Sequence, residues 1–186
     1  MAPSPKGVIA PSRYIAFLRG VNVGGVNLKM ADVACALRDA GFTAVTTILA
    51  TGNVLLDSSA SAADVRATAE TALREAFGYD AWVLVYPAAS VAAISADFPF
   101  EREVDGVHSY VTFVSDAQIL DELSDAAGPG EQIARGDGVL YWQVPKGATL
   151  DSPLGKTMGK KRYKAHSTTR NLRTVEKVLA SVDSAG

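Results

Sequence analysis

Cysteine, histidine and long apolar runs are all scarce in this chain of 186 residues, and each shortage excludes a class of protein. One cysteine excludes an intrachain disulfide framework and a cysteine-rich zinc site. The two histidines, His108 and His166, stand in no metal-binding spacing, so we expect no metal. No apolar run approaches the roughly 18 residues of a membrane span. Residues 1–12 hold three prolines and no apolar stretch, so we expect a disordered tail there and not a secretory signal.

The overall composition is that of an ordinary folded protein. Hydrophobic residues make up 48% of the chain and charged residues 20%, a balance that excludes global disorder. A chain of this mass hides about 70% of its unfolded surface when it folds, which is enough for a real core. Because the sequence shows neither a membrane span nor a secretory signal, we expect a cytoplasmic protein without a membrane partner.

Charge is distributed unevenly along the chain. Residues 156–173 hold seven of the 18 basic residues and none of the 20 acidic ones. A basic segment on an acidic remainder indicates a local anionic partner, and a solvated helix face is the alternative. Lys156, Lys160 and Lys164 are spaced by four, so a helix there would place them in one row. The neighbouring sequence Gly155-Lys156-Thr157 is not a P-loop, because Leu150 stands where that loop requires glycine.

Hydrophobic periodicity in the first half predicts alternating strands and helices. Strands are expected at 14–18, 44–49, 54–56 and 82–86, and helices at 30–41 and 62–77. Their order, β-α-β-β-α-β, is the ferredoxin-like pattern. We therefore expect an antiparallel four-stranded sheet with both helices on one face.

The second half partly repeats this order. Strands are expected at 109–114, 131–134 and 139–144, with helices at 90–96, at 117–123, from 152 onward and at 174–182. The expected fold class is α+β, with two packed α/β units. The first, residues 13–87, is ferredoxin-like; the second, residues 88–183, is a partial repeat with basic C-terminal helices.

A glycine-rich loop joins the first strand to the first helix and is the strongest candidate for a binding site. Glycines let several backbone N–H groups turn toward one point, and the following helix adds its positive N-terminal dipole. Such a loop suits a phosphate or a carboxylate, although its glycines do not match the dinucleotide-binding fingerprint. Glycines that only shape the connection are the alternative. The candidate ligand-binding residues of this loop are Arg19, Asn22, Gly24, Gly25, Asn27 and Lys29.

Short blocks of sequence extend the list of candidates beyond this loop. They read YIAFLRGVNVGG from Tyr14, MADV from Met30, TGNV from Thr51, TTRN from Thr168 and TV from Thr174. In this content and order the chain resembles domain-of-unknown-function family 1697 of bacterial proteins. The resemblance implies a two-part α+β fold and no assigned reaction. Its later blocks add four ligand-binding candidates: Thr51, Asn53, Arg170 and Asn171.

The chain departs from the pattern of this family at three positions. Ala50 stands where the family usually has glutamine, and Leu172 and Arg173 replace a tryptophan and an asparagine. If those residues line a site, this member binds a different ligand or binds it weakly.

Several functions are compatible with these features. We prefer a binding protein for a small phosphate-bearing anion. An enzyme acting on such a ligand is one alternative, with catalytic residues and cofactor that the sequence does not name; a nucleic-acid-binding or interaction module is another. The acidic remainder of the chain repels a long polyanion, which favours the compact ligand over nucleic acid. If the blocks form one site, the glycine loop, Thr51, Asn53, Arg170 and Asn171 should meet in one cleft.

Overall fold

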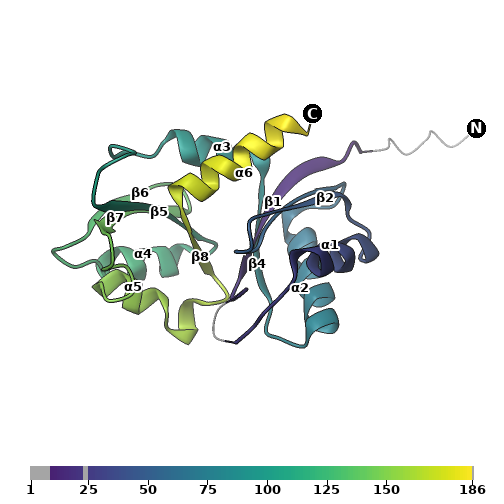
Figure 1. Ribbon diagram of the computed structural model, residues 1–186, viewed down its shortest axis with the longest axis horizontal. Helices are drawn as coiled ribbons and strands as arrows, with labels where there is room; N and C mark the ends of the chain where they lie inside the picture. Colours follow the sequence, from purple (N-terminus) through teal and green to yellow (C-terminus); the bar gives the residue numbers. More distant parts are fainter. Residues whose placement is uncertain (1–8, 23–24, 186) are drawn as a thin grey trace, which may run out of the picture.

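Two four-stranded antiparallel sheets form the centre of the protein (Figure 1). The computed structural model describes residues 9–22 and 25–185. The first sheet has the strand order β2-β3-β1-β4, which is that of a ferredoxin-like unit. Its elements are β1 (Ser12–Arg19), α1 (Met30–Asp39), β2 (Thr43–Ile48), β3 (Asn53–Ser58), α2 (Ala62–Phe77) and β4 (Trp82–Pro87), and helix α3 (Ala88–Ala96) follows.

The second half repeats this plan in full. Its sheet has the order β6-β7-β5-β8, and its last strand runs into a helix as β4 runs into α3. The elements are β5 (Val107–Val114), α4 (Ala117–Asp125), β6 (Gln132–Arg135), β7 (Val139–Pro145), α5 (Pro153–Met158), a 3-10 turn (Lys161–Tyr163), β8 (Ser167–Asn171) and α6 (Leu172–Ser184). The α+β class with two packed units is confirmed. Strand β8 completes what the sequence predicted as a partial repeat.

Helix α2 shows how local sequence sets these boundaries. Ser61 precedes the helix, and its hydroxyl accepts a hydrogen bond from the backbone N–H of Asp64 at 3.2 Å. Gly78 ends the helix with a φ of 64°, a left-handed conformation that glycine adopts without strain. Both ends lie where the sequence predicted them.

The two sheets face each other, and the helices cover their outer sides. Helices α1 and α2 lie on one side of the molecule and α4 and α5 on the other, whereas α3 and α6 pack together over the junction (Figure 1). Along β1, Ile15 and Phe17 point into the shared core between the sheets, and Ala16 and Leu18 point toward α1 and α2. The rings of Phe17 and Phe113, one from each sheet, stack at 4.5 Å between centroids. The two units therefore bury their inner faces against each other.

The predicted row of lysines after residue 155 is not present. Helix α5 ends at Met158, and Lys160 has an extended backbone with a ψ of 144° before the 3-10 turn begins. Gly155 and Gly159 lower the helix propensity of this segment, which explains its early end. Lys156, Lys160 and Lys164 consequently do not share one helix face.

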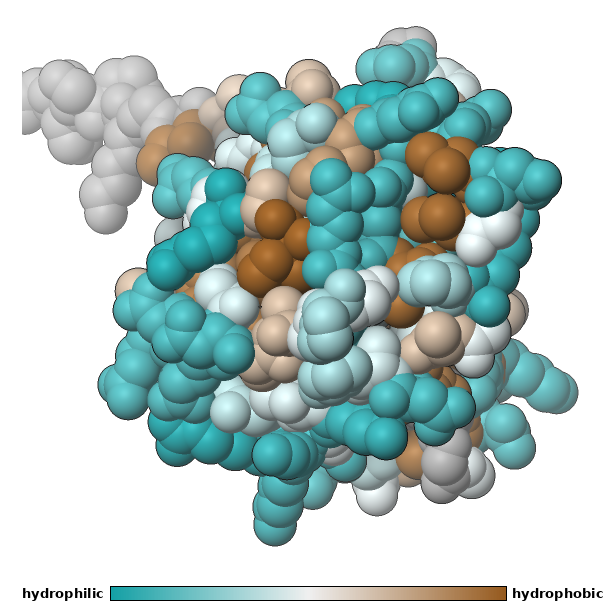
Figure 2. Space-filling model, turned by 90° about the vertical axis from the view of Figure 1, so that its left-hand side faces the viewer, coloured by the Kyte–Doolittle hydropathy of each residue, from teal (hydrophilic) through white to brown (hydrophobic). Residues whose placement is uncertain are grey.

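The surface carries few large apolar side chains. Figure 2 shows hydrophilic side chains over most of the face formed by the second unit, with small hydrophobic patches between them. Among residues 9–22 and 25–185, no helix is long and apolar enough to cross a bilayer. The predicted disordered tail lies mainly outside the described residues, and β1 begins at its last residue, Ser12.

Candidate functional site

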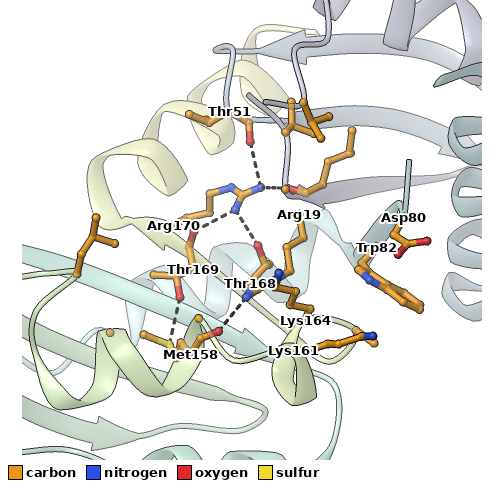
Figure 3. Close-up of a pocket in the computed structure, with 18 of the residues that line it drawn as sticks. Arg19, Thr51, Asp80, Trp82, Met158, Lys161, Lys164, Thr168, Thr169 and Arg170 are labelled. Carbon is orange, nitrogen blue, oxygen red and sulfur yellow. Dashed lines mark hydrogen bonds between the residues drawn. The ribbon is translucent and has the colours of Figure 1, made fainter. Parts of the chain in front are cut away.

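A cavity of about 830 Å³ lies between the two units, beside the edge strand β8 (Figure 3). Residues from both halves of the chain line it, so neither unit forms it alone. The lining residues are Leu18, Arg19, Gly20, Val21, Val26, Thr51, Tyr79, Asp80, Trp82, Trp142, Thr149, Leu150, Gly155, Met158, Gly159, Lys161, Lys164, Ala165, Thr168, Thr169 and Arg170.

Positive charge dominates this cavity. Its lining contains the side chains of Arg19, Lys161, Lys164 and Arg170, against the single carboxylate of Asp80. Within the part of the chain that the structure describes, no carboxylate lies in salt-bridge distance of Lys161 or Lys164. Both ammonium groups are therefore available to an anion that enters the cavity.

Arg19 ends β1 and reaches across to the second unit. Its two terminal nitrogens donate hydrogen bonds to the carbonyl oxygens of Ser167 at 2.7 Å and Met158 at 2.9 Å. A guanidinium has five N–H groups, so these bonds leave donors unused. Burial lowers the pKa of Arg19 from its ordinary value. Arg19 thus has a structural role and adds positive charge to the cavity wall.

Arg170 is buried, and its donors are fully used within the protein. Its Nε donates to the side-chain oxygen of Asn53 at 2.7 Å, and one terminal nitrogen donates to the carbonyl oxygen of Leu18 at 2.7 Å. Its remaining hydrogen bonds go to Thr168 Oγ1 and to the carbonyl oxygens of Thr169, Thr51 and Gly52. Burial, and secondly repulsion from Arg19, lower the pKa of Arg170 to about 10. Arg170 therefore clamps the two units together, with little hydrogen-bonding capacity left for a ligand.

The turn between β2 and β3 provides hydrogen-bond acceptors for Arg170. Asn53 is fully buried, and its amide nitrogen donates to the carbonyl oxygen of Ile48 and to Thr51 Oγ1, both at 2.9 Å. Gly52 has a φ of +83°, and a Cβ added there would lie 2.8 Å from the Cβ of Leu18. Asn53 thus positions Arg170, and Thr51 forms part of the cavity wall.

Asn22 holds the glycine-rich loop in place. It has a φ of 56°, and its side-chain nitrogen donates to the carbonyl oxygen of Ala50 at 2.6 Å. Its side-chain oxygen accepts from the backbone N–H of Leu28 at 2.9 Å. The first bond ties the loop to the β2–β3 turn and the second joins the two ends of the loop, so Asn22 has a structural role.

The other candidates of the loop lie away from the cavity. Gly25, with a φ of +86°, Asn27 and Lys29 are exposed and do not line it. Lys29 precedes α1, and its carbonyl oxygen accepts from the backbone N–H groups of the first helical turn. Gly24 lies outside the described residues.

Asn171 belongs to a different part of the surface. It caps α6, its side-chain oxygen accepting from the backbone N–H of Arg173 at 3.0 Å. Asn171, Leu172 and Arg173 line a second cavity of about 460 Å³. The expected convergence is thus partial: Arg19, Thr51 and Arg170 line the first cavity with Asn53 behind them, and Asn171 does not.

The basic segment offers fewer unpaired charges than its sequence suggests. Arg162 forms an ion pair with Glu122 at 2.5 Å, which lowers the pKa of that carboxyl to about 2, and Arg173 approaches Glu103 at 4.0 Å. With Arg170 buried, four exposed lysines remain. Of these four lysines, only Lys161 and Lys164 line the cavity. Counting charges along the sequence does not distinguish these two from the others.

Two further cavity residues, Trp82 and Asp80, were missed. Aromatic residues in strands are usually core, and Trp142 is fully buried, whereas Trp82 is partly exposed. The distinction has a local cause, since Trp82 opens β4 at an edge of its sheet, next to the junction of the units.

Comparison with known proteins supports the fold. A sequence profile described as "Protein of unknown function (DUF1697)" matches residues 12–141. The solved structure of the conserved bacterial protein SP0830 from Streptococcus pneumoniae is similar with a TM-score of 0.79 at 20% identity, covering 94% of this chain and 99% of that one. An unknown protein from Galdieria sulphuraria, 10% identical over 94% of this chain and 91% of its own, has a TM-score of 0.27 and supports no argument.

No curated protein matches the sequence. The family profile covers more than half of the chain, and the similar structure extends over both units. The resemblance noted in the opening blocks of the sequence is confirmed. The chain belongs to the DUF1697 family.

Proposed function

We propose that this protein binds a small phosphate-bearing anion in the cavity between its two units. One observation carries the proposal: Arg19, Lys161 and Lys164 line the same cavity, and the two lysines have no carboxylate partner among the described residues. A volume of about 830 Å³ lies in the range of small-molecule sites.

The walls of the cavity strengthen this attraction. Leu18, Val21, Leu150 and Met158 contribute apolar surface beside the cations. Apolar walls exclude water, and charges attract each other more strongly where water is excluded. A compact anion is attracted by these cations without approaching the acidic remainder of the chain. That acidic remainder would repel a long polyanion.

The test compares two double variants that remove the same charge from the same segment. Lys161→Ala with Lys164→Ala removes the lysines of the cavity; Lys156→Ala with Lys160→Ala removes two exposed lysines that do not line it. Pyrophosphate should raise the Tm of the wild type and of the control variant. It should have little effect on the cavity variant, whose Tm without ligand should match that of the control.

Two results would contradict the proposal. Pyrophosphate and inorganic phosphate could leave the Tm of the wild type unchanged, or both double variants could lose the response equally. The second result would indicate diffuse electrostatic attraction to the segment. Arg19→Ala is a poorer test, because it also removes the hydrogen bonds to Ser167 and Met158 and so weakens the fold.

A further inference from the structure

We infer that the anion is a nucleotide, whose phosphates contact the cationic side chains and whose base stacks on Trp82. This inference rests on the proposed function and adds the chemical class of the ligand. It is carried by the wall of the cavity that contains Tyr79, Asp80 and Trp82, the segment that leads into β4.

Trp82 is arranged as a platform with one covered face. The guanidinium carbon of Arg74 lies 4.6 Å from the centre of the Trp82 ring, and Arg74 is itself fixed by a hydrogen bond to the carbonyl oxygen of Ala81 at 2.8 Å. Trp82 is partly exposed and lines the cavity. An aromatic ring held in this way can stack with a planar ligand at little cost in side-chain entropy.

Two polar residues beside Trp82, Asp80 and Tyr79, are suited to the uncharged hydrogen-bonding groups of a ligand. Asp80 is exposed, and it has no cationic partner within residues 9–22 and 25–185. Its carboxylate repels phosphate but accepts hydrogen bonds from sugar hydroxyls or from N–H groups of a base. The buried hydroxyl of Tyr79 also lacks a partner within the described chain, and burial raises the pKa of Tyr79, so this hydroxyl stays neutral.

The cationic side chains and the aromatic and polar groups around Trp82 line one cavity. In Figure 3, Asp80 and Trp82 lie together at one side with Lys161 below them, and Arg19 and Lys164 lie toward the middle. A ligand that uses both parts needs a planar ring, uncharged donors and an anionic group in one molecule. A nucleotide supplies all three, whereas an inorganic phosphate supplies only the last.

The two tryptophans provide a direct measurement. Both tryptophans line the cavity, but Trp142 is fully buried, so a stacked base should quench Trp82, and Trp82→Leu should abolish the quenching. We would titrate the protein with ATP, GTP, CTP and UTP, and with inorganic tripolyphosphate as a ligand with phosphates but no base. At least one nucleotide should quench the fluorescence and bind about tenfold or more tightly than tripolyphosphate, a gain typical of one stacked base.

Variants separate the two parts of the site. Trp82→Leu should lower the affinity for the preferred nucleotide about tenfold, measured by calorimetry, and leave that for tripolyphosphate unchanged. Trp82→Phe keeps an aromatic platform and should recover most of the loss. The variant Lys161→Ala with Lys164→Ala should weaken both ligands.

The results distinguish this inference from the proposed function. If tripolyphosphate binds as tightly as all four nucleotides, or if Trp82→Leu weakens both kinds of ligand equally, the nucleotide inference is wrong and anion binding stands. If neither tripolyphosphate nor any nucleotide binds, the proposed function is wrong, and the nucleotide inference is wrong with it.

Discussion

Replacing Arg170 with methionine should destabilise the protein strongly, because Arg170 holds the two units together. Its side chain links β8 of the second unit to the end of β1 and the β2–β3 turn of the first. Methionine has a similar length without donors. The substitution would leave the carbonyl oxygen of Leu18 and the side-chain oxygen of Asn53 without their partner.

The size of the effect follows from these contacts. Each buried acceptor left without a donor costs about 1–3 kcal/mol, and such costs do not add fully because water enters the gap. The cavity beside Arg170 gives water a route to the gap. Two such acceptors, with incomplete additivity, should lower the free energy of unfolding by about 2–5 kcal/mol.

Urea denaturation followed by circular dichroism and by tryptophan fluorescence would measure this loss. In thermal denaturation, each kcal/mol lowers the Tm of a chain of this length by about 2–4 °C, so a fall on the order of 10 °C is expected. Arg173→Met is the matched control, because Arg173 is exposed and contacts Glu103 only at 4.0 Å. It should change the stability by less than about 0.5 kcal/mol.

Two results would refute this reasoning. A loss below about 1 kcal/mol for Arg170→Met would mean that the six hydrogen bonds contribute little beyond what water replaces. Equal losses for Arg170→Met and Arg173→Met would mean that the positive charge matters and the network does not.

Two further predictions concern backbone strain and pH. Gly52→Ala should cost about 2 kcal/mol or more, because alanine is strained at a φ of +83° and its Cβ would lie 2.8 Å from that of Leu18; Gly25→Ala, at a φ of +86° with nothing within 4 Å, should cost less in the same urea denaturation. Burial raises the pKa of Tyr86 to about 12, so between pH 10 and pH 12 only the unfolded chain loses that proton. The free energy of unfolding should fall through this window by at most about 1.4 kcal/mol per pH unit. Tyr86→Phe should flatten the slope of stability against pH, and an unchanged slope would contradict the assignment.

Most of the fold could be predicted because local signals agreed with the tertiary structure. Helix α2 has a capping serine, an apolar stripe and a closing glycine, and each of these acts within a few residues. Strand β8 was missed because its sequence, STTRN, has no apolar alternation. Its polar side chains are buried through partners far away in the sequence, such as Asn53 for Arg170. Patterns within one sequence do not show which distant residues will become hydrogen-bond partners.

The candidate site was predicted less completely for the same reason. The blocks that contain Arg19, Thr51 and Arg170 do meet. Two of the polar residues predicted as ligand contacts, Asn22 and Asn53, instead use their side chains to hold the backbone and, for Asn53, also Arg170. Hydrogen-bonding residues beside glycine turns serve either purpose, and only the positions of their partners decide between them. Whether a lysine of the basic segment faces the cavity depends on the turn after α5, which the charge pattern does not describe.

The sharing of one inner core by both sheets has a consequence for synthesis of the chain. The first sheet is complete once β4 has been made, but its inner face, with Ile15, Phe17 and Leu84, is covered by strands and a helix that come later in the chain. During synthesis of the second half, the apolar inner face of the first sheet is therefore exposed, and such a surface attracts chaperones or promotes aggregation. The Arg170 clamp and the cavity form only when β8 emerges. The proposed binding site is thus complete only after β8 has been synthesised, and nascent chains stalled before β8 would lack it.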